Sequence, residues 1–251
     1  MAARSGGLIG NLIVRWAGQV LSRRHARLAR STDRDAARWL RQARKLGRIA
    51  RALEMDAALH DRPAELRTGA LPPDTELLHV PSALRADLSP SGVVEPASGV
   101  SLAADLSVHH DMTPPRLSLR QVAVRPGHRA LRLDVWDVRG SFVSLALALP
   151  PEAVARVGRD DLVRLDYEIA LEQPCDVFAR LNLAHGPNTE QVVRKLDLRR
   201  RGDVIEFDVY YTAFDPSRAR EIWIDLIFNI RPLNRVTIGD LTISRRPRLS
   251  L

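Results

Sequence analysis

The 251-residue chain contains a single cysteine, Cys175. One cysteine excludes an intramolecular disulfide framework and a zinc site built from several cysteines. Aromatic residues are scarce, at 5% of the chain, and no uninterrupted apolar run reaches the length of a membrane-spanning helix. The single cysteine fits a reducing compartment. The expected location is the cytoplasm, with peripheral attachment to the inner membrane left open.

Local signatures of catalysis are also missing. The chain has no GxSxG nucleophile elbow, no HExxH motif, no P-loop and no glycine-rich dinucleotide turn. His109, His110 and Asp111 are adjacent, so in a strand they cannot all point toward one metal ion. We expect no metal, no cofactor and no enzymatic activity. A pair of glycosidase carboxylates from distant strands would leave no local signature, and that alternative stays open.

Positive charge is in excess, and the excess is confined to one end of the chain. The formal net charge is +8, and residues 1–68 hold 15 of the 38 Lys and Arg residues but 6 of the 30 Asp and Glu residues. Apolar residues recur there at spacings of three and four, which predicts a hairpin of two amphipathic helices. The second helix carries basic residues on its polar face, among them Arg38, Arg41, Lys45, Arg48 and Arg51.

Four interpretations of this basic face remain open. It is a solvated surface of an arginine-rich protein, or it binds an anionic membrane surface, nucleic acid or another protein. Nucleic acid is the disfavoured partner, because the chain has no helix-turn-helix, zinc-finger or RNA-binding signature.

The rest of the chain changes character twice. Residues 69–96 are rich in proline, which predicts a connector without regular elements that packs along the following domain. From residue 97 to 251, runs of alternating apolar and polar residues predict about nine strands. The run Leu131–Leu149 predicts two strands paired as a hairpin around a turn at Arg139-Gly140. The expected fold is mainly β: an antiparallel jelly-roll β-sandwich preceded by the helical hairpin of residues 1–68.

Several aromatic residues are in phase with the polar rows of the predicted strands. Flat rings that alternate with carboxylates, amides and guanidinium groups have the chemistry of a sugar-binding platform. The alternative is that these rings pack under the helices or the connector. The candidate ligand-binding residues are Trp136, Trp223, Asp134, Arg180, Asn182, Asp225 and Tyr210.

The segment Leu181–Gln191 (LNLAHGPNTEQ) gathers polar groups at a turn. His185 and Asn188 either cap the backbone of this turn or read a ligand at the rim of the sandwich. Both interpretations remain open, and His185 and Asn188 are further candidate ligand-binding residues.

Four segments resemble a bacterial family of unknown function found in alphaproteobacteria: GSFVSLALALP (140–150), VFARLNLAHGPNTEQ (177–191), EIWIDLIF (221–228) and VTIGDLTISRRPR (236–248). The resemblance implies a common architecture and carries over no activity and no functional residue. The closing VTIGDLTISRRPR also resembles the last strand of galactose-binding-like jelly rolls, such as many carbohydrate-binding modules. Fold likeness alone does not assign a function.

From these patterns we expect a non-catalytic binding module that recognises a glycan or glycoconjugate on a polar, aromatic face of the sandwich. The alternative is a structural or adaptor protein that docks through its basic helices on the inner membrane or in a larger assembly.

Overall fold

The computed structural model describes residues 74–125, 128–137, 140–199, 202–229 and 232–248. They belong to the second of the two units into which the chain divides, Ala58–Leu251. The predicted helical hairpin and its five basic candidates, Arg38, Arg41, Lys45, Arg48 and Arg51, lie outside the described residues.

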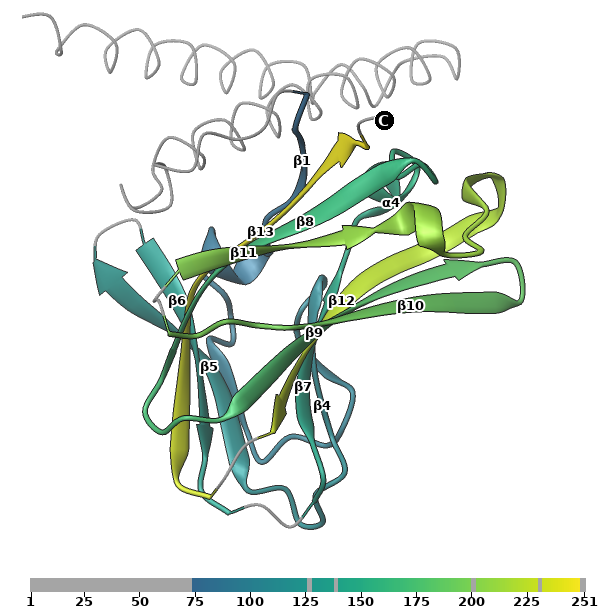
Figure 1. Cartoon of the computed structure of the whole chain (residues 1–251). Coiled ribbons are helices and arrows are strands. Elements are labelled where there is room, and N and C mark those ends of the chain that lie inside the picture. The colour runs from purple at the N-terminus through teal and green to yellow at the C-terminus, as the bar shows by residue number, and fades with distance from the viewer. Residues whose placement is uncertain (1–73, 126–127, 138–139, 200–201, 230–231, 249–251) are drawn as a thin grey trace, which may run out of the picture. The chain divides into compact units, whose positions relative to one another are not determined.

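Two antiparallel sheets lie face to face and form a β-sandwich, which confirms the predicted fold class (Figure 1). Among the described residues, sheet A has seven strands, in the order β11 (Gly202–Asp208), β8 (Asp161–Leu171), β13 (Asn234–Pro247), β6 (His128–Val135), β5 (Leu117–Arg125) and β2 (Gly92–Val94), with β1 (Glu76–His79) paired to β13. The same part of the chain contributes six strands to sheet B, in the order β10 (Asn188–Lys195), β9 (Asp176–His185), β12 (Ala219–Asn229), β7 (Val143–Ala148), β4 (Leu106–His110) and β3 (Val100–Ala103). Short helical turns are η1 (Ser82–Leu84), α4 (Pro151–Val154), η2 (Val209–Tyr211) and η3 (Pro216–Arg218).

One apolar core fills the space between the sheets. Because successive side chains of a strand point to opposite faces, each strand turns one row inward. Leu131, Leu133 and Val135 form that row on β6, and Leu226 and Phe228 belong to it on β12. Burial of these side chains stabilises the fold by roughly 25 cal/mol per Å². The alternate residues of each strand are left for the two outer faces, where the candidate site residues lie.

The predicted hairpin at Leu131–Leu149 is wrong. β6 pairs with β5 and β13 in sheet A, whereas β7 pairs with β4 and β12 in sheet B. The chain between them therefore crosses from one sheet to the other. Each of the two strands buries an apolar row against the same core. Their pattern of polar and apolar residues is therefore the pattern that a hairpin would show, although the strands belong to different sheets.

Strands also form where prolines predicted no regular element. β1 pairs with β13, and β2 pairs with β5 as a three-residue edge strand of sheet A. Proline is tolerated beside such a short edge because few ladder hydrogen bonds are lost. The segment 101–108 contains parts of the paired strands β3 and β4. Within the described part of the chain, no helix combines the length and the apolar character needed to span a membrane.

Candidate functional site

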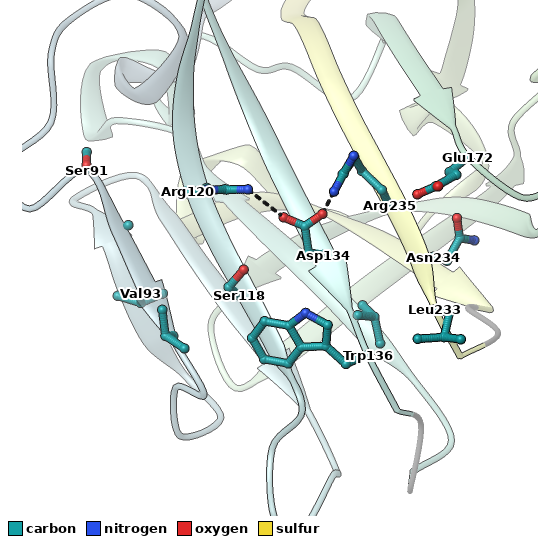
Figure 2. A pocket seen from close by; sticks show the side chains of 13 residues that line it. Ser91, Val93, Ser118, Arg120, Asp134, Trp136, Glu172, Leu233, Asn234 and Arg235 are labelled. Carbon is teal, nitrogen blue, oxygen red and sulfur yellow. Dashed lines mark hydrogen bonds and ion pairs between the residues drawn. The ribbon is translucent and has the colours of Figure 1, made fainter.

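A groove of about 650 Å³ lies on the outer face of sheet A, over β2, β5, β6 and the start of β13. The strand register brings its polar residues together. Asp134 on β6 lies directly opposite Ser118 on β5 and Arg235 on β13, and Arg120 lies one outward position further along β5. Figure 2 shows Arg120, Asp134 and Arg235 in one row, with the Trp136 ring beside it.

Asp134 lies at the centre of this row and is 8% exposed. Its Oδ1 accepts a hydrogen bond of 2.6 Å from Nε of Arg235, and its Oδ2 accepts one of 3.3 Å from Nη2 of Arg120. The hydrogen bond and the charge of Asp134 raise the pKa of the Arg235 guanidinium above its ordinary value, and Glu172 adds to this effect. Because one carboxylate holds two guanidinium groups, both are positioned while about half of each arginine side chain stays exposed.

Apolar groups flank this polar row. The side chain of Trp136, the residue after β6, is 41% exposed, and its backbone N–H donates to the carbonyl of Arg116. Leu233 is 69% exposed and has a φ of 56°, in the left-handed region that bulky residues rarely adopt. An exposed leucine held in a strained backbone conformation at a groove is typical of a functional position.

Small or internally satisfied residues complete the groove. A Cβ on Gly92 would lie 2.6 Å from Cβ of Arg120, so the absence of a side chain there leaves room for the arginine. Asn234 exchanges hydrogen bonds of 3.0 Å with the backbone N–H and carbonyl of Gln173. It therefore shapes the wall of the groove and has little capacity left for a ligand.

A second group of candidates lies on the outer face of sheet B. There Oδ2 of Asp225 on β12 accepts hydrogen bonds from the guanidinium of Arg180 and the amide of Asn182, both on β9. Gln191 on β10 donates to Oδ1 of Asn182 at 3.1 Å, which extends the network across three strands. Trp223 lies opposite Asn182 in the same register row. Asn182 and Asp225 are buried, so these groups hydrogen-bond to one another and hold the strands in register.

The two tryptophans therefore do not share a platform. Trp136 follows a strand of sheet A and Trp223 lies on a strand of sheet B, and the core separates the two outer faces. Asp134 goes with Trp136, whereas Arg180, Asn182 and Asp225 go with Trp223. The two rings therefore cannot contribute to one sugar-binding face. A sugar-binding site lies either on the outer face of sheet A with Trp136 or on the outer face of sheet B with Trp223.

Tyr210 lies in a third place. It is not on the polar row of β11, because the strand ends at Asp208 and Tyr210 belongs to the turn η2. Its ring meets Tyr211 edge to face at 5.5 Å, and the Arg248 guanidinium lies 4.5 Å from its centroid.

His185 and Asn188 bracket the turn that joins β9 to β10. His185 is buried, packs edge to face on Phe214 and accepts a hydrogen bond of 3.4 Å from the N–H of Asp215 at Nδ1. Gly186 has a φ of 50°, which a two-residue turn of this kind requires. These contacts fix the His185 ring in the fold, while its buried Nε2 has no hydrogen-bond partner among the described residues. Within the described ranges, no cluster of three His, Cys, Asp or Glu side chains is arranged to hold a metal ion.

Sequence reasoning missed Arg120, Arg235, Ser118 and Leu233 as groove residues. Ser118 and Arg120 alternate with Leu117 and Leu119 along β5, so the sequence alone indicates that their side chains lie on an outer face. Their proximity to Asp134 depends on the pairing of β5 with β6 and β13, which no local pattern encodes.

Three of the solved structures similar to this chain share 8–10% sequence identity with it. The enzymatically active domain of tailspike protein 4 of bacteriophage CBA120 matches with a TM-score of 0.40 and 9% identity, over 56% of this chain but 19% of that domain. A family 11 carbohydrate-binding module from Clostridium thermocellum, in complex with a mixed-linked tetrasaccharide, matches with a TM-score of 0.41 and 10% identity over 59% of this chain and 92% of the module. A xylan-binding domain of module family 22 from Paenibacillus barcinonensis matches with a TM-score of 0.36 and 8% identity over 70% of this chain and 99% of the domain.

Similarity at this level says nothing about function in this chain. No curated protein matches the sequence. One protein family does match, and its profile covers residues 1–251, the whole chain. The resemblance seen in the four sequence segments is thereby confirmed: the chain belongs to the family of unknown function DUF6478.

Proposed function

We propose that the groove on the outer face of sheet A binds a glycan without catalysing a reaction. The observation that carries the proposal is the placement of a half-exposed tryptophan ring and a fixed Arg–Asp–Arg row in one concave surface. A volume of about 650 Å³ falls in the range of clefts that hold small ligands.

The groove offers the two kinds of contact that a sugar needs. Sugar rings present apolar C–H faces, which stack on aromatic rings, and hydroxyl groups, which require directional hydrogen bonds. Trp136 provides the ring, and the guanidinium groups of Arg120 and Arg235 provide planar sets of N–H donors. Asp134 holds both guanidinium groups before a ligand arrives, which lowers the conformational entropy lost on binding.

The carboxylates of the groove favour binding over hydrolysis. Glycoside hydrolases of the common types use a pair of carboxyl groups, one as general acid and one as base or nucleophile. Among the described residues that line the groove, the carboxylates are Asp134 and Glu172. Both oxygens of Asp134 already accept hydrogen bonds from arginine, so this group is not placed to donate a proton.

The test compares Trp136 and Trp223, the tryptophans on the outer faces of sheet A and sheet B, in the full-length protein. Trp136→Ala should abolish retention on a glycan array and in affinity electrophoresis, because it removes the stacking surface of the groove. Trp223→Ala is the matched control: it removes the same side chain from the other sheet and should leave retention unchanged.

Far-ultraviolet circular dichroism and urea unfolding of both variants check that the sandwich is intact. Equal loss of retention in both variants, or loss in Trp223→Ala alone, contradicts the assignment of the groove. Retention of no glycan by the natural protein contradicts the proposed function itself.

A second candidate function is favoured by the charge distribution rather than by the groove. Residues 1–68 hold 15 of the 38 Lys and Arg residues and 6 of the 30 Asp and Glu residues, so this end attracts anionic surfaces. In this alternative the protein is a structural or adaptor protein. Its basic residues bind it to the inner membrane or to a larger assembly. The two functions are compatible, because they use different parts of the chain.

A further inference from the structure

The free hydrogen-bonding groups of the groove are mostly donors. Each guanidinium group carries five N–H donors and no acceptor, and Arg120 and Arg235 each donate one hydrogen bond within the groove, to Asp134. Among the acceptors, both oxygens of Asp134 bind arginine and the side chain of Asn234 binds the backbone of Gln173, which leaves the carboxylate of Glu172 at the edge of the groove. A ligand that completes the groove must therefore bring acceptors.

The charges on this face point to the same conclusion. Arg120 lies directly opposite Arg132 in the pairing of β5 with β6. Like charges in directly opposite positions destabilise a sheet. Nε of Arg132 is buried and has no hydrogen-bond partner among the described residues. Arg120, Arg132 and Arg235 thus lie on three adjacent strands around one central carboxylate. An anion bound beside Arg120 would relieve this repulsion.

The negative charge of Glu172 reduces the attraction of the groove for an anion. Glu172 lies beside Arg235 at the edge of the groove, where its N–H donates to the Arg235 carbonyl (Figure 2). Together, Arg120, Arg132, Arg235, Asp134 and Glu172 carry a net charge of +1. Of the two arginines that bind Asp134, Arg120 is the one further from Glu172 along the row. A negatively charged group therefore binds best toward Arg120.

We propose that the glycan bound in the groove is acidic, with its carboxylate or sulfate group held by the guanidinium groups of Arg120 and Arg235. This inference rests on the proposed function and names the class of its ligand. Planar guanidinium groups bind such oxyanions through paired N–H donors. The Trp136 ring then stacks on the sugar that carries the charge or on its neighbour.

The test measures the affinity of the full-length protein for a hexamer of galacturonic acid and for the same hexamer with its carboxyl groups reduced. Because residues 1–68 are basic, retention of an acidic polymer alone is not diagnostic, and the readout is its dependence on groove residues. The acidic hexamer should bind at least tenfold more tightly, and Arg120→Gln should remove about tenfold of affinity for it. Glu172→Gln should raise that affinity by about two- to fivefold.

Arg194→Gln is the matched control, because it removes an equal charge from an exposed position on β10 in sheet B. It should leave both affinities unchanged. Binding of dextran sulfate, compared with uncharged dextran, shows which acidic group the groove prefers. If only the sulfated polymer binds in a manner that depends on Arg120, the acidic group is a sulfate. If only the galacturonate hexamer does so, the acidic group is a carboxylate.

Two results overturn the inference and are distinguishable from each other. If both hexamers bind equally and Trp136→Ala abolishes both, the groove binds neutral sugars and the proposed function stands. If acidic binding is insensitive to both Arg120→Gln and Trp136→Ala and the reduced hexamer does not bind, the groove is not the binding site and the proposed function fails with the inference.

Discussion

Arg235 donates a hydrogen bond of 2.6 Å to Asp134 although 101 positions separate the two residues in the chain. The pairing of β6 with β13 makes this contact, since it places the two residues directly opposite each other. On the other sheet, Arg180 and Asp225 form the equivalent pair at 2.8 Å. The carboxylates of both pairs are nearly buried, and the pairs differ in their hydrogen bonds: Arg235 and Arg120, each about half exposed, donate one bond each to Asp134, whereas Arg180 donates two to Asp225 and the fully buried Asn182 donates a third. Asn182 therefore ties the Asp225 pair to the fold, and the exposed guanidinium groups leave the Asp134 pair accessible on one side.

Asp225→Asn should destabilise the protein more than Asp134→Asn. One oxygen of Asp225 accepts hydrogen bonds from Arg180 and Asn182, and Asn182 is fully buried. Hydrogen bonds to charged groups contribute about 1.5–3 kcal/mol when buried, whereas half-exposed arginines contribute less. We expect losses of about 3 kcal/mol for Asp225→Asn and about 1 kcal/mol for Asp134→Asn in urea unfolding. Equal losses would contradict the structural role assigned to Asp225.

Leu233→Gly should stabilise the protein and weaken glycan binding. The left-handed conformation of Leu233 costs roughly 1–2 kcal/mol for an L-residue and is free of strain for glycine, whose greater entropy in the unfolded chain offsets part of the gain. We expect a rise of about 0.5–1 kcal/mol in the free energy of unfolding. Leu233→Ala is the control, since it removes the exposed side chain but keeps the strain. Both variants should lose affinity and only the glycine variant should gain stability.

The stability of the sandwich should fall between pH 4 and pH 2 because of Asp105. Burial alone would raise its pKa, but hydrogen bonds from His79 and Ser82 outweigh burial and lower the pKa to about 2. A carboxyl group with a depressed pKa in the folded state contributes stability above its unfolded pKa of about 4, and loses it as the pH falls through 2.

Asp105→Asn should therefore lower the free energy of unfolding at pH 7 by about 2 kcal/mol and flatten its dependence on pH between 4 and 2. Urea titrations across this range measure both effects. Asp160→Asn, a change at an exposed aspartate, should alter stability by less than about 0.5 kcal/mol. An unaltered pH profile in Asp105→Asn would show that other groups govern the acid response.

Neutralising the basic N-terminal residues should abolish any binding to anionic vesicles. The variant replaces Arg38, Arg41, Lys45, Arg48 and Arg51 with glutamine in the full-length protein. Each removed charge weakens attraction to an anionic surface by about 1 kcal/mol. Co-sedimentation with vesicles that contain phosphatidylglycerol should be lost, and Trp136→Ala should leave it unchanged. If the natural protein fails to sediment with such vesicles, the membrane form of the adaptor alternative is wrong.

The sequence predicted the sandwich because its signal is local. Alternation along β6 placed Leu131, Leu133 and Val135 inside and Asp134 and Trp136 outside, and the structure has them there. The same phase placed Trp223 on the outer face of β12, and Trp136, the residue after β6, on the outer side of sheet A. The same alternation predicted a hairpin between β6 and β7 that does not exist, because a buried row is equally satisfied by a strand from either sheet.

By itself, the chain's order of polar and apolar residues determined the fold class, the outward direction of Trp136, Asp134 and Trp223, and the charge of the N-terminal quarter. Tertiary structure alone decided which of these residues meet. Strand pairing brought Arg235 and Arg120 to Asp134 and separated Trp136 from Trp223, since neighbours in a sheet are selected by long-range contacts and by the connections between sheets. The groove forms because of that pairing. Alternation of polar and apolar residues determines which face of the sheet a side chain occupies, but it does not determine which residue lies opposite on the neighbouring strand.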